Sequence, residues 1–99
     1  IGAAKETGAV LWLCTQQDQA SLAPDLVVAS QVYDWTGMIR EIISQNKAGV
    51  LGGKTYILKL ENDGLKIAYN PAYSLDAAVK AAGDKAIADI ISGAVKVEP

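Results

Sequence analysis

The sequence predicts an α/β fold, with helices over residues 34–47 and 75–92 packed on a mixed sheet that includes a hairpin over residues 55–69. Apolar residues recur at every second position in some segments and at every third or fourth position in others, which is typical of strands and helices respectively. Of the 99 residues, 51% are hydrophobic and 20% are charged. This balance is ordinary for one small globular domain or for part of a larger one.

The first third of the chain holds two predicted strands separated by a polar loop. Residues 1–7 have the character of the last turns of a helix, with Gly8 as its left-handed cap. Because a domain rarely begins in the last turns of a helix, we expect preceding elements to be missing. Residues 11–14 predict a short buried strand, residues 16–25 a loop, and residues 26–32 a second strand rich in β-branched side chains.

A helix and a hairpin are predicted next. Asp34 is the expected N-cap of the helix. One helical face carries the apolar residues Trp35, Met38, Ile39, Ile42 and Ile43. Gly49 and the pair Gly52-Gly53 end the helix and let the chain turn. Residues 55–60 and 65–69 alternate between apolar and polar, and the Asp-Gly dipeptide between them is a strong hairpin signal.

The last predicted helix starts near Ser74, the expected N-cap, with Asp76 placed to suit the helix dipole. Gly83 lies inside the helical pattern and weakens it by about 1 kcal/mol relative to alanine. Gly93 is the expected residue that ends the helix. The tail over residues 94–99 is a candidate for a final extended strand.

Composition argues against several functional classes. The net charge of −2 and the absence of a basic stripe argue against nucleic-acid binding. No apolar run approaches the length of a membrane span. The chain has no histidine and a single cysteine, which removes a Ser-His-Asp triad and the usual zinc ligands. We therefore expect neither an enzyme nor a metal or cofactor site, and we expect Cys14 to be a buried, inert thiol.

Polar and aromatic residues follow both of the first two strands. Gln16 and Asp18 come after the first strand, and Tyr33 and Trp35 come after the second. Ligands of open α/β sheets collect at the carboxyl ends of strands, so we predict these four residues as ligand-binding residues. Structural roles stay open, because Trp35 can pack in the core and Asp18 can cap its loop. Trp12 lies within a strand and is expected in the core.

Four motifs in the right order then resemble one known family. They are Asp18-Gln19 with Leu22-Ala23-Pro24 and Ser30, the pair Gly52-Gly53, residues 60–71 (LENDGLKIAYNP) and residues 91–97 (ISGAVKV). Together they are similar to the "DQ…LAP…V…S" signature, the glycine pair, the "LKxGxVxLAP" segment and the closing "IxSGxIxV" of the basic membrane lipoprotein family. This family comprises the purine-nucleoside-type solute-binding proteins of ABC importers.

The resemblance implies a type I periplasmic-binding-protein fold, in which two α/β lobes close on a ligand. Residues 1–99 would form the carboxyl-terminal portion of that domain, as part of the second lobe. The implied function is the ligand-binding component of an ABC importer. Its partners would be a small-molecule ligand, a membrane permease, and the missing amino-terminal part of the same protein or another copy of the chain. The implied location is the periplasm or the outer face of the cytoplasmic membrane, with a lipid anchor on a missing amino-terminal segment.

Other functions remain open beside the importer. A ligand-sensing domain of a regulatory protein with the same fold is the main alternative. An enzyme acting on nucleosides and an assembly domain with an empty cleft are the others.

Two positions depart from the family pattern. Nucleoside binders of the family carry an acidic residue two positions before the Asp-Gln pair, which the resemblance implies holds the ribose hydroxyls, and this chain has Gln16 there. A lysine common near the end of the next strand is replaced by Tyr33, and Tyr33-Asp34-Trp35 resembles the "NWG" variant of some members. With no evident anion–cation clamp, we expect a purine nucleobase or nucleoside-like solute, read by amides and carboxylates at its edge and covered by an aromatic ring.

Overall fold

The computed structural model describes residues 1–8 and 12–97 of the chain. Its elements in chain order are helix α1 (Gly2–Glu6), strand β1 (Trp12–Cys14), the 3₁₀ helix η1 (Ala20–Leu22), strand β2 (Val27–Tyr33), helix α2 (Thr36–Lys47), strand β3 (Leu65–Tyr69) and helix α3 (Ala77–Ile91). The elements that the structure shares with the prediction have ends shifted by one or two residues, but the strand predicted over residues 55–60 does not form.

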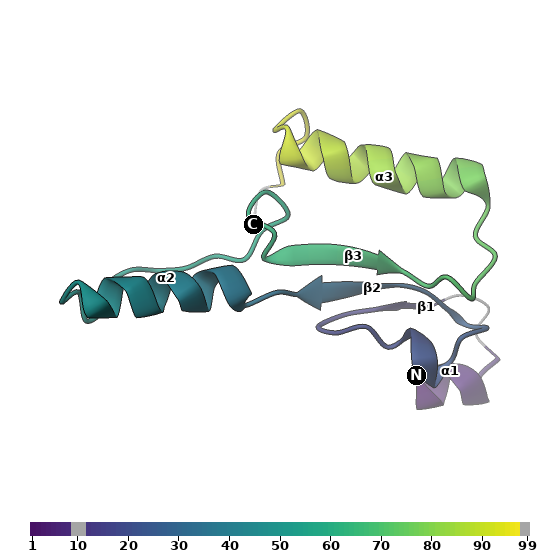
Figure 1. Ribbon diagram of the computed structural model, residues 1–99. Helices are drawn as coiled ribbons and strands as arrows, with labels where there is room; N and C mark the ends of the chain where they lie inside the picture. The colour runs from purple at the N-terminus through teal and green to yellow at the C-terminus, as the bar shows by residue number, and fades with distance from the viewer. Residues whose placement is uncertain (9–11, 98–99) are drawn as a thin grey trace.

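The three strands form one mixed sheet in the order β1-β2-β3. Strand β2 runs parallel to β1 and antiparallel to β3, with Cys14 opposite Ser30 and Tyr33 opposite Leu65. Helix α3 lies over one face of this sheet, and α1 lies on the other side (Figure 1). The predicted α/β fold with a mixed sheet is therefore confirmed.

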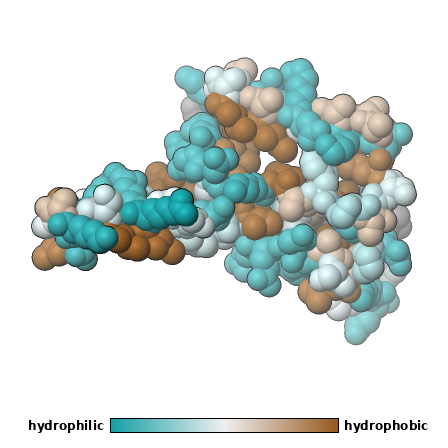
Figure 2. Space-filling model, in the orientation of Figure 1, coloured by the Kyte–Doolittle hydropathy of each residue, from teal (hydrophilic) through white to brown (hydrophobic). Residues whose placement is uncertain are grey.

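The sequence predicted that helix α2 covers the sheet, and this prediction is wrong. The helix projects beyond the end of the sheet (Figure 1). The residues Trp35, Ile39, Ile42 and Ile43 on its apolar face are between 41% and 50% exposed. Figure 2 shows hydrophobic atoms along the lower side of this arm. The radius of gyration is 17.0 Å, whereas a compact domain of about 100 residues has about 13 Å. About half of the surface of these four side chains is therefore left uncovered by the described residues.

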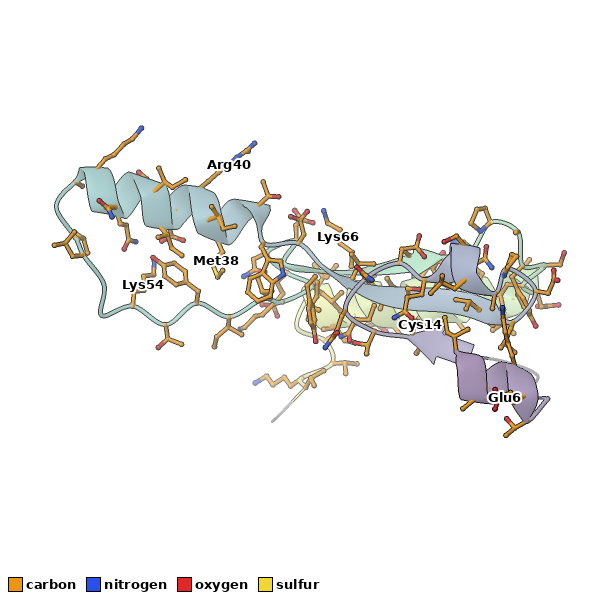
Figure 3. The ribbon with its side chains drawn as sticks, turned by 90° about the horizontal axis from the view of Figure 1, so that it is seen from below. Glu6, Cys14, Met38, Arg40, Lys54 and Lys66 are labelled. Atoms are coloured by element: carbon orange, nitrogen blue, oxygen red, sulfur yellow. The ribbon has the colours of Figure 1, made fainter. Side chains whose placement is uncertain are left out.

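The other face of α2 is held by polar side chains of the segment that follows it. Lys54 forms an ion pair with Glu41, and the Tyr56 hydroxyl donates a hydrogen bond to Gln45 Oε1 at 3.2 Å. Figure 3 shows Met38 directed toward this returning segment, while Arg40 points away from it. The amphipathic pattern of α2 is confirmed, but polar contacts rather than the apolar stripe orient it.

The predicted hairpin over residues 55–69 is wrong in its first strand. Residues 55–60 form no strand, and β3 pairs with β2 instead. The Asp-Gly turn itself is confirmed, because Asp63 has a left-handed φ of 57° and the Leu65 N–H donates to the Lys59 carbonyl at 2.9 Å. Alternation identifies an extended segment but does not select its partner.

The predicted residue that ends α3 is confirmed, but the predicted N-cap of this helix is wrong. Asp76, and not Ser74, caps the helix, since its Oδ1 accepts the N–H groups of Ala78 at 2.8 Å and Val79 at 3.3 Å. Gly93 has a φ of 76°, as expected for a residue that ends a helix. Residues 94–97 form no strand, so the predicted final strand is wrong in this part, and residues 98–99 lie outside the described ones.

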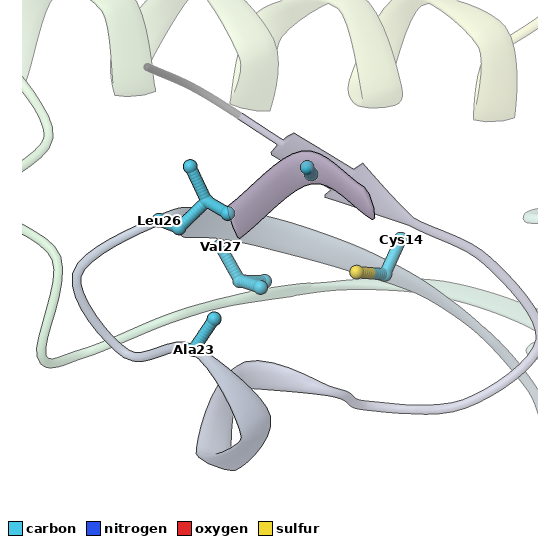
Figure 4. Packing of buried hydrophobic residues seen from close by; sticks show 5 residues of the cluster. Cys14, Ala23, Leu26 and Val27 are labelled. Carbon is cyan, nitrogen blue, oxygen red and sulfur yellow. The ribbon is translucent and has the colours of Figure 1, made fainter. Parts of the chain in front are cut away.

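A small core joins α1 to the sheet (Figure 4). Its buried residues are Ala4, Cys14, Ala23, Leu26 and Val27. Cys14 is 4% exposed, which confirms the predicted buried thiol. The side chain of Trp12, predicted in the core, lies outside the described structure. Beside this cluster the buried Asn70 ties β3 to β2, because its Nδ2 donates to the Pro24 carbonyl at 2.8 Å and to the Val27 carbonyl at 2.7 Å.

Candidate functional site

Three of the four predicted site residues meet at the carboxyl ends of β1 and β2. The Tyr33 N–H donates a hydrogen bond to the Gln16 carbonyl at 3.2 Å. Gln16 has a left-handed φ of 78°, which turns the chain directly after β1. The rings of Tyr33 and Trp35 pack edge to face, with centroids 6.2 Å apart. An amide residue and two aromatic rings therefore occupy one end of the sheet, as the sequence predicted.

The fourth predicted residue, Asp18, ties its own loop to β2. Its Oδ1 accepts the Ala20 N–H at 3.0 Å and the Ser30 hydroxyl at 3.4 Å. The same hydroxyl accepts the Gln19 N–H at 3.2 Å. Ser30 is fully buried, so these bonds hold the loop against the sheet. The structural role that the sequence left open for Asp18 is thus present, and its role in ligand binding stays a prediction.

An ion pair that the sequence did not indicate lies at the same end of the sheet. Lys66 Nζ donates to Asp34 Oδ2 at 2.8 Å, and Asp34 Oδ1 accepts the Thr36 N–H at 3.0 Å. The hydrogen bond with Lys66 is the largest cause of the lowered pKa of Asp34, which lies well below the usual value of 3.8. The same bond raises the pKa of Lys66 above 10.5. Both groups are therefore charged throughout the physiological pH range.

The sequence indicated one residue of this ion pair, Asp34, but not the other. Asp34 was predicted as the N-cap of α2, but the N-cap is Trp35. The Asp34 carboxylate lies one residue earlier and accepts the N–H of Thr36, the first residue of the helix. The lysines are spread along the sequence and are typical of solvated surface, so no pattern singles out Lys66. The observed register places Lys66 opposite Val32, two residues from Asp34. Only the correct strand pairing brings the lysine to the end of β2.

Asp34 also lines a groove of about 480 Å³ between α2 and the segment that returns along it. The other polar side chains of the groove are Thr36, Glu41, Lys54, Thr55, Tyr56, Asn62 and Asp63. Gln16, Asp18, Tyr33 and Trp35 do not line it. A second and more apolar groove of about 640 Å³ lies between α3 and residues 58–61. The predicted site is therefore an open surface at a strand end, next to the first groove.

The chemistry of this strand end suits binding. It offers an amide at Gln16, a carboxylate at Asp34, an ammonium at Lys66 and the exposed ring of Trp35. In residues 1–8 and 12–97, no three His, Cys, Asp or Glu side chains gather where they could hold a metal ion. Within the same ranges, no helix combines the length and apolar character needed to cross a membrane.

The chain was also compared with known proteins. The model of one protein family, Bmp, described as ABC transporter substrate-binding protein PnrA-like, matches residues 1–98. None of the curated proteins compared with the chain matches it. The family match covers nearly the whole chain.

Proposed function

The chain belongs to the family of PnrA-like substrate-binding proteins of ABC transporters, and on this basis we propose that it helps to bind a purine nucleobase or nucleoside-like solute for import. Membership of the family carries a substrate-binding role, a small-molecule ligand, a permease partner and a location outside the cytoplasm. The class of ligand and the residues that touch it are our proposal.

The observation that carries the proposal is the aromatic pair at the carboxyl end of β2. Trp35 is a large side chain at the end of the sheet, yet it is 50% exposed. Its edge-to-face contact with Tyr33 restrains the indole and leaves a flat surface open to a planar ligand. The Gln16 carbonyl accepts the Tyr33 N–H, so this residue lies beside the same surface. An amide carries both donors and an acceptor, which suits the edge of a purine.

We also propose that another part of the assembled protein covers the apolar face of α2. The apolar face of α2 is about half exposed, which is unusual for a stripe of large side chains in a stable protein. We assign its cover to the remainder of the binding protein or to a second copy of the chain. Hydrogen exchange on the intact protein would then show slow exchange for residues 39–43, and fast exchange there would count against a cover.

A lipid anchor on a segment outside this sequence completes the proposal. An anchored binding protein stays close to its permease at the membrane. Incorporation of labelled palmitate by cells that produce the intact protein would detect the anchor. Recovery of unlabelled protein from the soluble extracytoplasmic fraction would count against it.

Calorimetry on the intact protein tests the ligand class, with adenine, guanosine, inosine and riboflavin as probes. We expect the purines to bind and Trp35→Ala to weaken binding about two- to tenfold, since stacking contributes about 0.5–1.5 kcal/mol. Asp18→Ala tests the carboxylate, provided that its melting temperature shows that the loop still folds. Arg40→Ala is the matched control, because Arg40 points away from the returning segment and the groove (Figure 3). Unchanged affinity in both Trp35→Ala and Asp18→Ala would remove these residues from the site, and absence of purine binding would reject the ligand class.

A further inference from the structure

A buried hydroxyl group on β2 connects this strand to the loop that follows β1. Ser30 is fully buried. Its hydroxyl donates to Asp18 Oδ1 at 3.4 Å and accepts the Gln19 N–H at 3.2 Å. A hydroxyl has a single proton to donate, and here the Asp18 carboxylate receives it. Ser30 therefore holds both the main chain and one side chain of the loop.

Two other contacts join the same loop to β2, but neither can orient Asp18. The Tyr33 N–H donates to the Gln16 carbonyl at 3.2 Å, which involves main-chain atoms only. Thr15 Oγ1 donates to Gln31 Oε1 at 2.9 Å, but this contact is exposed, so water competes with it. Because Ser30 is buried, water cannot take the place of its hydroxyl.

The Asp18 carboxylate has one oxygen bound by the protein and one oxygen left open. Oδ1 accepts the Ala20 N–H at 3.0 Å and the Ser30 hydroxyl. Each carboxylate oxygen offers about two lone-pair sites, so Oδ1 is fully used. Among the described residues Oδ2 accepts no hydrogen bond, and Asp18 is exposed. The two bonds to Oδ1 orient the carboxylate and so determine where Oδ2 can accept a third bond.

We propose that Ser30 is a positioning residue of the binding site, which holds Asp18 so that its Oδ2 accepts an N–H or O–H group of the ligand. The inference rests on the proposed function and adds a residue that touches no ligand itself. A side chain that is already held in place loses less conformational freedom when the ligand binds. Without the Ser30 hydroxyl, the Ala20 N–H is the one remaining partner of Oδ1 among the described residues. Ligand binding would then have to order the carboxylate as well.

Calorimetry on the intact protein with adenine, guanosine and inosine tests this role in Ser30→Ala, Asp18→Ala and the double variant. We expect Ser30→Ala to weaken binding about two- to tenfold, the range for ordering one side chain. In the Asp18→Ala background the same change should have no effect on affinity, because no carboxylate is left to position. Ser30→Thr keeps the hydroxyl and should retain most of the affinity.

Asn70→Ala is the matched control for the loss of a buried polar group. Asn70 is also buried and its Nδ2 also binds β2, at the Val27 carbonyl, but none of its side-chain hydrogen bonds reaches residues 15–19. This variant should lower the melting temperature and retain the wild-type affinity.

Four results would overturn the positioning role while the proposed function stands. They are an equal loss of affinity in Asn70→Ala, an equal effect of Ser30→Ala in both backgrounds, unchanged affinity in Ser30→Ala, and a loss in Ser30→Thr as large as in Ser30→Ala at an unchanged melting temperature. No binding of adenine, guanosine or inosine to the wild type would reject both the inference and the proposed function.

Discussion

Helix α3 comes close to β3 at Gly83, and this contact makes a testable prediction. A Cβ atom at Gly83 would lie 2.5 Å from the Tyr69 hydroxyl oxygen and 3.7 Å from Tyr69 Cζ. The first distance is an overlap and the second is an ordinary contact. The hydroxyl would therefore have to shift to admit a side chain at Gly83, which gives a reason for a glycine inside this helix.

Two opposing terms set the expected magnitude of Gly83→Ala. Alanine favours the helix over glycine by about 0.8–1 kcal/mol. Relieving the overlap with Tyr69 costs about 1–3 kcal/mol, the range for an overpacked contact. We expect a net loss of about 1 kcal/mol in the free energy of unfolding. In a Tyr69→Phe background the blocking oxygen is gone, so the same change should instead stabilise the protein by about 0.5–1 kcal/mol.

Urea unfolding of the four variants, followed by far-UV circular dichroism, measures this change of sign. The coupling energy between the two positions should be about 2 kcal/mol, which is within the range for residues in contact. Gly37→Ala is the control, because a Cβ at Gly37 meets nothing within 4 Å. It should be neutral or stabilising in both backgrounds. Equal stabilisation by Gly83→Ala with and without the Tyr69 hydroxyl would refute the packing of α3 on β3.

Three further changes test other parts of the structure. Asn70→Ala should destabilise the protein by about 1–3 kcal/mol in thermal unfolding, because it removes the amide that donates to the buried Val27 carbonyl and to the part-buried Pro24 carbonyl. Asp76→Ala should cost about 1 kcal/mol by removing the cap of α3, whereas Ser74→Ala should stay within about 0.5 kcal/mol. The contribution of the ionised Asp34 to stability is complete above its unperturbed pKa of 3.8 and is lost as the pH falls below that value, because folding lowers its pKa. The stability difference between wild type and Asp34→Asn should therefore shrink on acidification, and a difference independent of pH would contradict the Asp34–Lys66 bond.

Local patterns predicted the features that depend on a few neighbouring residues. The β-branched run before Tyr33 became β2, because branched side chains suit an extended backbone. Gly8 and Gly93 have the left-handed φ values that were expected of residues that end helices. The meeting of Gln16 with Tyr33 also followed from sequence order, since parallel strands end at the same edge of a sheet.

Contacts between distant residues decided the rest. The alternation in residues 65–69 indicated a strand, but its pairing with β2 depends on the surface that β2 presents, more than thirty residues earlier. That pairing brings Lys66 to Asp34, so the ion pair of the candidate site is invisible in any short window of sequence. The direction of α2 also depends on polar contacts across a turn, between Glu41 and Lys54. Backbone geometry and periodicity depend on a few neighbouring residues. Strand partners and charge pairs depend on residues that are far apart in the chain, so only the tertiary structure shows which segments pair.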